Sequence, residues 1–360
     1  MSIPSSGSGR TICGSASSAS MPTNMSGTKA SGNSGAASSR ASPCRRDHRG
    51  RKSMSLQIEP VGADYVAKIR GVDLSKPLDP ATVEAIIKAS DHYAVLVFHD
   101  QPLTDEQLVA FGATFGPLDV GLQEKLMKKV QDRYASAAIS DISNVDAASG
   151  DVADRRHKQA VMNVGNRFWH SDSSYDRHPY RYSILTAKTA ASKGGATEYA
   201  DLRAAYDALD DDTKALIADR TATFYSHFTR QWLGIEDRPE DRRVFPPVRW
   251  PMVRTHPGSG RKVLWCDSKV CEISGMSIPE GRALAHELIE HIGQRERVYA
   301  HVWQPNDVVM YDNRSVLHRG RRFDMSERRE MRRVATVDDS TALGEAPLSA
   351  ATPAELLAAQ

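Results

Sequence analysis

The most constraining feature of the sequence is a series of short apolar stretches with strand character, separated by turns. They are predicted at Tyr65–Ile69, Ala94–Asp100, 182–190, 262–267, 298–303, 307–312 and 332–337. A doubly wound parallel sheet would need a helix between successive strands, and that alternation is absent from the pattern. The sequence therefore predicts a mostly β fold with flanking helices, as an antiparallel barrel or jelly roll.

Helices are predicted beside and between these strands. One covers about 80–93, where apolar residues recur with helical spacing. Thr104 is expected to cap a second helix, with Glu106 near the capping-box position. Two more are predicted over about 201–220 and over 279–296. The polar, irregular segment 121–160 is interpreted as a long loop or lid.

The first 53 residues differ in composition from everything that follows. They hold fifteen serines and eight Lys or Arg residues against one acid, Asp47, so the segment carries +7. Because the whole chain carries +2, the remainder is mildly acidic. We expect 1–53 to be a disordered Ser/Gly-rich basic extension, because it offers little apolar surface to bury. An upstream extension with the true start at Met54 is the favoured interpretation, and an organelle transit peptide is the alternative.

The rest of the chain is predicted to form one folded domain over 54–340, followed by a loose Ala-rich tail over 341–360. A nearly balanced net charge gives no reason to expect nucleic acid or an anionic membrane surface as a partner. No run of about 18 apolar residues is present, so no membrane span is expected. The cysteines form neither a CxxC pair nor a Cys/His cluster, and we expect free thiols in the cytoplasm. They are Cys13, Cys44, Cys266 and Cys271.

The string FWHSDSSY at 168–175 carries the most chemical information. If it is a strand, His170 and Asp172 project to the same face, because side chains alternate along a strand. A third ligand must then come from elsewhere, and His318 in DNRSVLHRGRR is the best candidate. Two histidines and one carboxylate on one side of an ion form the facial triad of non-heme Fe(II) oxygenases. A strand-end histidine that hydrogen-bonds to an acid is the plainer alternative.

A second feature is the arginine-rich string SERREMRRVATV. On a strand, Arg329, Met331 and Arg333 share one face, while Arg328 and Arg332 share the other. Two arginines facing a barrel interior are costly unless they meet carboxylates, and a guanidinium binds a carboxylate through two parallel hydrogen bonds. This face therefore indicates anionic ligands. A solvated charged edge remains the alternative, and it suits Arg328 and Arg332 well.

The third feature is GGATEYADLRAAYDAL at 194–209. Gly194 and Gly195 permit a tight turn, and the hydroxyl of Thr197 just after it can donate to a carboxylate. Ordinary turn chemistry explains this string equally well when it is taken alone.

These three features, in this order, resemble the taurine/2,4-D dioxygenase family. Thr197 lies 27 residues after His170, and Arg329 and Arg333 lie 11 and 15 residues after His318. The wider strings RYSILTAK, RTHPGSGRK and DNRSVLHRGRRFD resemble the 2,4-dichlorophenoxyacetate branch most. The resemblance runs from about residue 55 to residue 340, and it implies a double-stranded β-helix fold, a form of jelly roll.

The resemblance also implies roles for individual side chains. Three would bind Fe(II): His170, Asp172 and His318. Thr197 and Arg329 would hold the distal carboxylate of the co-substrate 2-oxoglutarate. Arg333 would meet the acidic group of the substrate, and Asn166 would be a further substrate contact. No catalytic residue beyond the metal ligands is expected.

The activity that the resemblance implies is Fe(II)- and 2-oxoglutarate-dependent hydroxylation of a small organic acid with O2. An aryloxyalkanoate such as 2,4-dichlorophenoxyacetate would give a phenol and glyoxylate, with succinate and CO2. A dioxygenase for a sulfonate such as taurine, or for another carboxylate, is the alternative, and a non-catalytic barrel that binds a metal or an acid is a further one. A hydrolase is disfavoured because no Gly-X-Ser-X-Gly elbow is present. The sequence leaves homo-oligomerisation open.

Overall fold

The computed structural model describes residues 56–120, 136–154, 164–236, 238–338 and 349–350. The predicted extension 1–53, nearly all of the predicted tail and much of the predicted loop 121–160 lie outside this part. The boundaries of the domain therefore stay predictions. Within the described part, no helix combines the length and apolar character that crossing a membrane requires.

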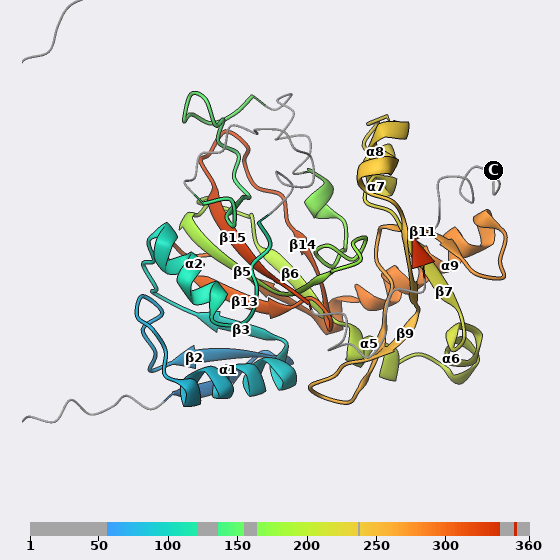
Figure 1. The fold of residues 1–360 in the computed structure, drawn as a ribbon, viewed down its shortest axis with the longest axis horizontal. Coiled ribbons are helices and arrows are strands. Elements are labelled where there is room, and N and C mark those ends of the chain that lie inside the picture. Colours follow the sequence, from blue (N-terminus) through green and yellow to red (C-terminus); the bar gives the residue numbers. More distant parts are fainter. Residues whose placement is uncertain (1–55, 121–135, 155–163, 237, 339–348, 351–360) are drawn as a thin grey trace, which may run out of the picture. The chain divides into compact units, whose positions relative to one another are not determined.

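A seven-stranded sheet forms one layer of the described domain (Figure 1). Its neighbouring strands are antiparallel, except that β2 and β3 pair in parallel. The predicted loop contributes a short strand to its edge, β4. In spatial order the strands are β1 (Gln57–Val61), β2 (Ala63–Arg70), β3 (Val95–Phe98), β13 (Val308–Asp312), β5 (Tyr180–Thr189), β15 (Glu330–Val337) and β4 (Ser140–Asp141).

A three-stranded antiparallel sheet packs against one face of the larger sheet. Its order is β12 (Val298–His301), β6 (Thr197–Asp201) and β14 (Val316–Gly320). A buried apolar cluster joins the two layers, with Tyr199 and Val316 from the small sheet and Leu185, Tyr311 and Met331 from the large one. Two antiparallel layers around a shared core make a jelly roll, so the predicted fold class is confirmed.

Helices α1 (Pro80–Tyr93) and α2 (Asp105–Ala113) cover the opposite face of the large sheet (Figure 1). Along β5, Tyr182 and Ile184 belong to the cluster under these helices, whereas Leu185 belongs to the cluster between the sheets. This alternation is the pleat of a strand, and it turns Ser183 toward the interior between the sheets. The helices thus close one face of the sheet and leave the other face for the site.

The start of α2 corrects one prediction. Thr104 caps the helix as expected, because its side chain accepts a hydrogen bond from the backbone N–H of Gln107 at 3.3 Å. The reciprocal bond comes from the backbone N–H of Thr104 to Oε1 of Gln107, at 2.8 Å. A capping box uses the third helical residue, which is Gln107, so the assignment of Glu106 was wrong.

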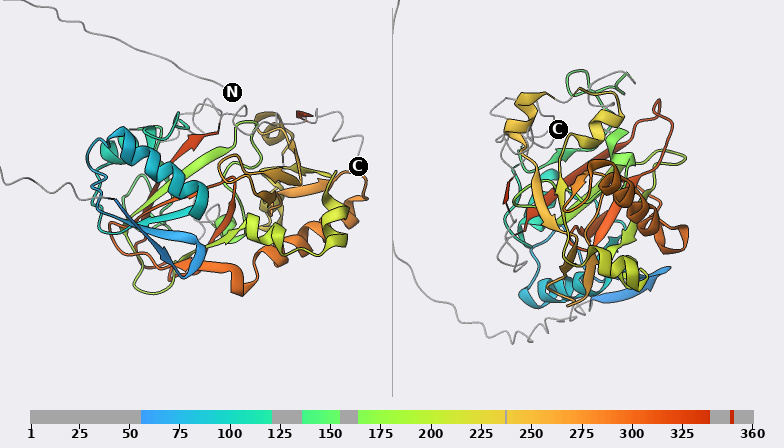
Figure 2. Two further views of the ribbon diagram at one scale, coloured as in Figure 1. Left: turned by 90° about the horizontal axis from the view of Figure 1, so that it is seen from below. Right: turned by 90° about the vertical axis from the view of Figure 1, so that its right-hand side faces the viewer.

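A second group of elements surrounds a separate apolar cluster that includes Trp250, Trp265 and Leu288. It contains sheets of order β11-β7-β8-β16 and β10-β9. In Figure 1 and in the left view of Figure 2, its helix α9 lies away from α1 and α2. The strands are β7 (Thr221–Phe224), β8 (Val248–Pro251), β9 (Val253–Thr255), β10 (Lys262–Leu264), β11 (Val270–Ile273) and β16 (Ser349–Ala350). The helices are α5 (Leu202–Asp207), α6 (Asp211–Ile217), α7 (Phe228–Trp232), α8 (Pro239–Val244) and α9 (Ile278–Ile292).

The predicted helix over 201–220 is two short helices, α5 and α6. The break has a local cause, because Asp210 accepts hydrogen bonds from the backbone N–H and the hydroxyl of Thr213 at 2.7 and 2.8 Å. An acceptor of this kind starts a new helix rather than continuing an old one. The helix predicted over 279–296 is α9, which Ser277 caps and which ends before Gly293.

Candidate metal and co-substrate site

The backbone brings His170 and His318 together. His318 lies on β14, and the two residues form an isolated antiparallel bridge. The N–H of each donates to the carbonyl of the other, at 3.0 and 2.9 Å. Their rings stand 4.2 Å apart, measured between centroids. The sheet therefore sets the spacing of the two imidazoles.

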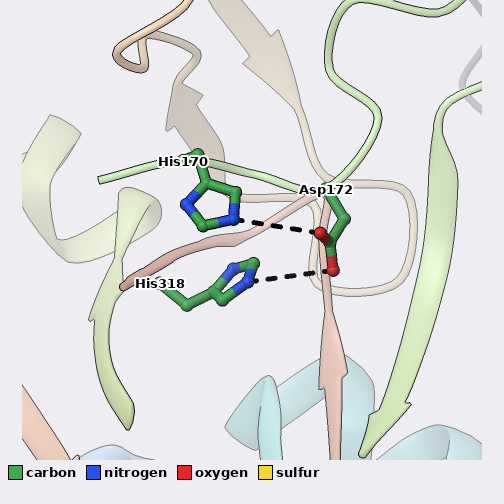
Figure 3. Close-up of side chains that lie close together, drawn as sticks. All are labelled: His170, Asp172 and His318. Atoms are coloured by element: carbon green, nitrogen blue, oxygen red, sulfur yellow. Dashed lines mark ion pairs between the residues drawn. The ribbon is translucent and has the colours of Figure 1, made fainter. Parts of the chain in front are cut away.

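Asp172 completes a cluster of three buried ligand-type side chains (Figure 3). Its Oδ1 lies 3.9 Å from Nε2 of His170, and its Oδ2 lies 3.8 Å from Nε2 of His318. The ligand atoms all lie within 4.8 Å of one another. Asp172 begins a turn rather than lying on a regular strand, so the strand prediction for FWHSDSSY was wrong in detail.

The imidazole of His170 is oriented for binding an ion. Nδ1 of His170 lies 2.8 Å from the carbonyl oxygen of Phe168, which can only accept, so this nitrogen carries the proton. Nε2 is then the lone-pair nitrogen, and it faces Asp172. A hydrogen bond at the far nitrogen is the usual way in which proteins fix a metal-binding histidine.

Three further side chains hold the Asp172 carboxylate. Ser183 and Tyr311 donate to Oδ2 at 2.7 and 2.8 Å. Arg333 donates to Oδ1 through one nitrogen. Sequence reasoning missed Ser183 and Tyr311, although a tyrosine after the apolar residues Val308, Val309 and Met310 of β13 was a signal, because a buried phenol usually needs a partner.

The protonation states suit a cation. Burial alone would raise the pKa of Asp172, but the Arg333 guanidinium and then His318 and His170 bring it below its ordinary value. Burial lowers the pKa of His318 to about 4 and the pKa of His170 well below its usual range. Near neutral pH the cluster is one carboxylate and two neutral imidazoles, which is the form that binds metal ions.

Arg329 lies at the other end of the site without an acidic partner among the described residues. Burial lowers the pKa of its guanidinium to about 10. Its Nη2 donates to the carbonyl of Gly195 at 3.2 Å. A Cβ at residue 195 would stand 3.2 Å from Nε of Arg329, and the φ angle there is +69°. Glycine is therefore needed at 195 both for the turn and for the approach of the arginine.

Thr197 lies on β6 and is buried. Nε1 of Trp303 donates to its hydroxyl oxygen at 2.9 Å. The indole N–H can only donate, so the hydroxyl proton of Thr197 stays available for another acceptor. This arrangement was not foreseen from the sequence.

The other arginines of the SERREMRRVATV string point away from the site. Arg328 and Arg332 both pair with Glu330, at 2.8 and 3.2 Å, and Arg332 also pairs with Asp105 at the start of α2. The two faces of the string therefore differ as predicted. Arg332 is not at a solvated edge, however, because its side chain is only 19% exposed.

All seven predicted site residues line one cavity, of about 90 Å³. The cavity lies among β5, β6, β13, β14 and β15, together with the 3-10 turn Gly165–Arg167 that carries Asn166. The predicted residues in its wall are Asn166, His170, Asp172, Thr197, His318, Arg329 and Arg333.

The chain matches a protein-family model described as "Taurine catabolism dioxygenase TauD, TfdA family" over residues 57–335. It belongs to the TauD/TfdA family. Members that match it closely are named as α-ketoglutarate-dependent dioxygenases, and this chain is an enzyme of that class.

Two curated relatives and one solved structure locate it within the family. The α-ketoglutarate-dependent 2,4-dichlorophenoxyacetate dioxygenase of Cupriavidus pinatubonensis (strain JMP 134 / LMG 1197) is 43% identical over 288 residues, which cover 80% of this chain and 99% of that protein. The (S)-phenoxypropionate/α-ketoglutarate dioxygenase of Sphingobium herbicidovorans is 34% identical, covering 78% and 94%. The crystal structure of AAD-2 with Mn(II) and N-oxalylglycine superposes with a TM-score of 0.74 at 40% identity, covering 82% and 100%.

Proposed function

We propose that this dioxygenase uses Fe(II) and 2-oxoglutarate to hydroxylate an aryloxyalkanoate, releasing a phenol. The observation that carries the proposal is that two histidines and one carboxylate line the same cavity as two arginines, Arg329 and Arg333. The two arginines are suited to two separate anions. The names of the two curated relatives, which act on 2,4-dichlorophenoxyacetate and (S)-phenoxypropionate, support the choice of substrate class.

His170, Asp172 and His318 would hold the iron. Their two nitrogens and one oxygen are the donor set of non-heme iron oxygenases, and three protein ligands leave other positions open. Bound iron, with 2-oxoglutarate and O2, supplies the oxidising power that converts a substrate C–H bond to C–OH, with succinate and CO2 as co-products. Ser183 and Tyr311 would hold the Asp172 carboxylate in place as a ligand.

Arg329 and Thr197 would hold the distal carboxylate of 2-oxoglutarate. Arg329 is a half-buried cation that has no acidic partner in the described part of the chain, and its partial loss of water is costly until an anion arrives. The hydroxyl oxygen of Thr197 already accepts a hydrogen bond from Nε1 of Trp303, so the hydroxyl proton of Thr197 can be donated to another group. Together they offer the charge and the donors that a carboxylate requires.

Arg333 would bind the acidic group of the substrate, with Asn166 beside the same cavity. Arg333 contacts Asp172 through a single nitrogen. Once a metal ion takes the charge of Asp172, the guanidinium is free to bind a second carboxylate through two hydrogen bonds. An arginine placed there would hold the carbon between the acid and the ether oxygen closest to the oxidant. Hydroxylation of that carbon gives a hemiacetal, which separates into a phenol and, from an aryloxyacetate, glyoxylate.

A panel of acids tests the proposal. The full-length enzyme would be assayed with Fe(II), 2-oxoglutarate and O2 for succinate release that depends on each acid, using 2,4-dichlorophenoxyacetate, 2-phenoxypropionate and taurine. We expect both aryloxyalkanoates to drive succinate formation and the phenol to appear in equal amount. Turnover with taurine alone would assign a sulfonate substrate instead, and no oxygen uptake with any acid would indicate a non-catalytic binding protein.

A further inference from the structure

Arg329 lies just before the part of β15 that the sheet holds. The strand begins at Glu330, and its register with β5 is irregular between Glu330 and Met331. Arg333 lies further along the strand and is paired on both sides, with β5 and with β4. Strand pairing thus fixes the backbone at Arg333, whereas the backbone at Arg329 needs another support.

Asn144 supplies that support, because it binds both backbone polar groups of Arg329. The backbone N–H of Asn144 donates to the carbonyl oxygen of Arg329 at 3.2 Å. Its side-chain Oδ1 accepts from the backbone N–H of Arg329 at 2.8 Å. The side-chain carbonyl of Asn144 therefore takes the part that a backbone carbonyl takes in a regular antiparallel ladder. The hold of the sheet is extended in this way to a residue that its own strands do not pair.

The same side chain also holds the loop that leads to Arg329. Nδ2 of Asn144 donates to the carbonyl oxygens of Met325 and Glu327, at 3.1 and 2.7 Å. The carboxylate of Glu327 is fixed in turn by the backbone N–H and the hydroxyl of Ser192, at 2.6 and 2.7 Å. Asn144 is only 4% exposed, and the three hydrogen bonds of its amide group all go to residues 325–329. A buried polar group that is fully satisfied in this way makes its surroundings rigid.

These contacts lie at the wall of the cavity that holds the metal cluster. Asn144, Phe323, Met325 and Arg329 all line it. The guanidinium of Arg329 is held at its other end, where Nη2 donates to the carbonyl of Gly195 at 3.2 Å. Arg329 is thus fixed both at its backbone, by Asn144, and at its tip. Binding of a carboxylate by an arginine depends on such placement, because a misplacement of about 1 Å is costly.

We propose that Asn144 is a positioning residue that fixes Arg329 for the distal carboxylate of 2-oxoglutarate. This inference rests on the proposed function, in which Arg329 binds that carboxylate. Asn144 acts through Arg329 and does not itself donate to the co-substrate, because an amide has two N–H donors and both already serve the loop. Loss of the side chain would leave the guanidinium in the cavity but no longer at one fixed place.

The test is the affinity for 2-oxoglutarate, measured without turnover. Full-length enzyme loaded with Mn(II) would be titrated calorimetrically with 2-oxoglutarate. We expect Asn144→Ala to weaken its binding roughly tenfold, which lies within the range of coupling between residues in contact. Affinity for Mn(II) should change less than about twofold, because the metal cluster is untouched. If Asn144→Ala does not fold, Asn144→Ser, which keeps a small polar side chain, should weaken 2-oxoglutarate binding in the same direction.

A double variant separates positioning from general support of the cavity. In the background of Arg329→Ala, the further change Asn144→Ala should weaken 2-oxoglutarate binding less than about twofold, because the guanidinium that Asn144 positions is already gone. A residue that merely supports the wall would weaken binding by the same factor in both backgrounds. Equal tenfold losses with and without Arg329 would therefore overturn the proposal.

Gln101 offers a matched control, because its side-chain amide also joins three backbone groups. Its Oε1 accepts from the N–H of Leu74 at 2.9 Å, and its Nε2 donates to the carbonyls of Val72 and His99 at 3.4 and 3.3 Å. The described wall of the cavity includes none of these four residues. Gln101→Ala should leave the affinity for 2-oxoglutarate unchanged, even where it lowers the unfolding temperature as Asn144→Ala does. A tenfold loss in Gln101→Ala would mean that lower stability alone explains the effect.

The single variants distinguish this inference from the proposed function. Normal 2-oxoglutarate binding by Asn144→Ala, with weak binding by Arg329→Ala, would overturn the role of Asn144 alone. Normal binding by Arg329→Ala would overturn the co-substrate role of Arg329, and the role of Asn144 with it.

Discussion

Among the residues that the structure describes, two clusters contain the residue types and spacing of a metal site, and they differ in what surrounds them. One is His170, Asp172 and His318, and the other is Asp91, His256 and Asp312. In the second cluster both nitrogens of His256 are used, Nε2 by Asp312 at 3.0 Å and Nδ1 by Ser259 at 2.9 Å.

The difference is greatest at the carboxylates. Arg314 binds Asp312 through Nε at 2.9 Å and Nη2 at 2.6 Å, so both oxygens already have a cation. Burial would raise the pKa of Asp312, but Arg314 and His256 bring it below the ordinary value. Arg333 contacts only Oδ1 of Asp172, and that cluster lines a cavity. A donor set suits a metal ion only where lone pairs remain for it, and Oδ1 of Asp172 accepts from Arg333 alone whereas both oxygens of Asp312 accept from Arg314.

The largest expected effect is a loss of bound metal and of turnover when the first cluster is changed, but not when the second cluster is changed. His318→Ala should lower iron-dependent turnover by at least about a thousandfold, because an imidazole ligand is lost and the oxidising centre with it. The matching change His256→Ala should leave bound metal unchanged, since its nitrogens already serve Asp312 and Ser259. Metal content after dialysis, alongside succinate release, measures both. Equal metal loss in the two variants would erase the distinction.

The next prediction concerns the stability that the second cluster, Asp91, His256 and Asp312, gives to the fold. Arg314→Met should lower the free energy of unfolding by about 3–5 kcal/mol, because it leaves the buried Asp312 carboxylate without its cation. Urea denaturation measures the change. Arg328→Met removes a partly exposed arginine and should cost less than about 1 kcal/mol. If Arg314→Met were as stable as the wild type, Asp312 would not depend on that pair.

A third prediction concerns the two arginines of the open site. Arg329→Ala should raise the KM for 2-oxoglutarate roughly 30-fold or more and leave the KM for the acid substrate nearly unchanged, because a charge-assisted contact is removed from one ligand only. Arg333→Ala should do the reverse. Steady-state kinetics with each ligand varied in turn measure the split. Similar rises in both constants for either variant would show that the roles are wrongly divided.

The smallest expected effect concerns the buried residue Asp338. It is fully buried, and neither carboxylate oxygen has a hydrogen-bond donor in the described part of the chain. Burial raises its pKa to about 6 from an ordinary 3.8, although Arg314 opposes the shift. Between pH 3.8 and about pH 6 the folded state therefore keeps a proton that the unfolded state has lost. Above about pH 6 Asp338 is ionised in the folded state as well, and its buried charge destabilises the fold. Asp338→Asn should gain about 1 kcal/mol at pH 8 and little near pH 4, measured by urea denaturation at both pH values. A gain independent of pH would contradict this.

The sequence predicted those parts of the site that come from local spacing. His170 and Asp172 lie two residues apart, and the arginine string alternates as a strand should, so each face could be assigned. Ser183 and Tyr311 could not be assigned, because they are neighbours only through the pairing of β5 with β13. The register between two strands that are distant in the sequence cannot be predicted from the sequence of either strand alone.

Two of the strands that the sequence did not predict have a related explanation. β6 and β14 carry Thr197 and His318, together with acids and arginines, so their sequences lack the apolar run that marked the other strands. Functional side chains replace the residues that would signal a strand, and local patterns fail most where a site is built.

The reciprocal backbone pair between His170 and His318 has a consequence for how the enzyme is made. At about 5–20 residues per second, a ribosome adds His318 on the order of ten seconds after His170. Until then the nascent chain holds two of the three ligand residues and no β14 against which to align them. The full ligand set would therefore become available to an ion only after β14 has been made and has paired with the segment of His170.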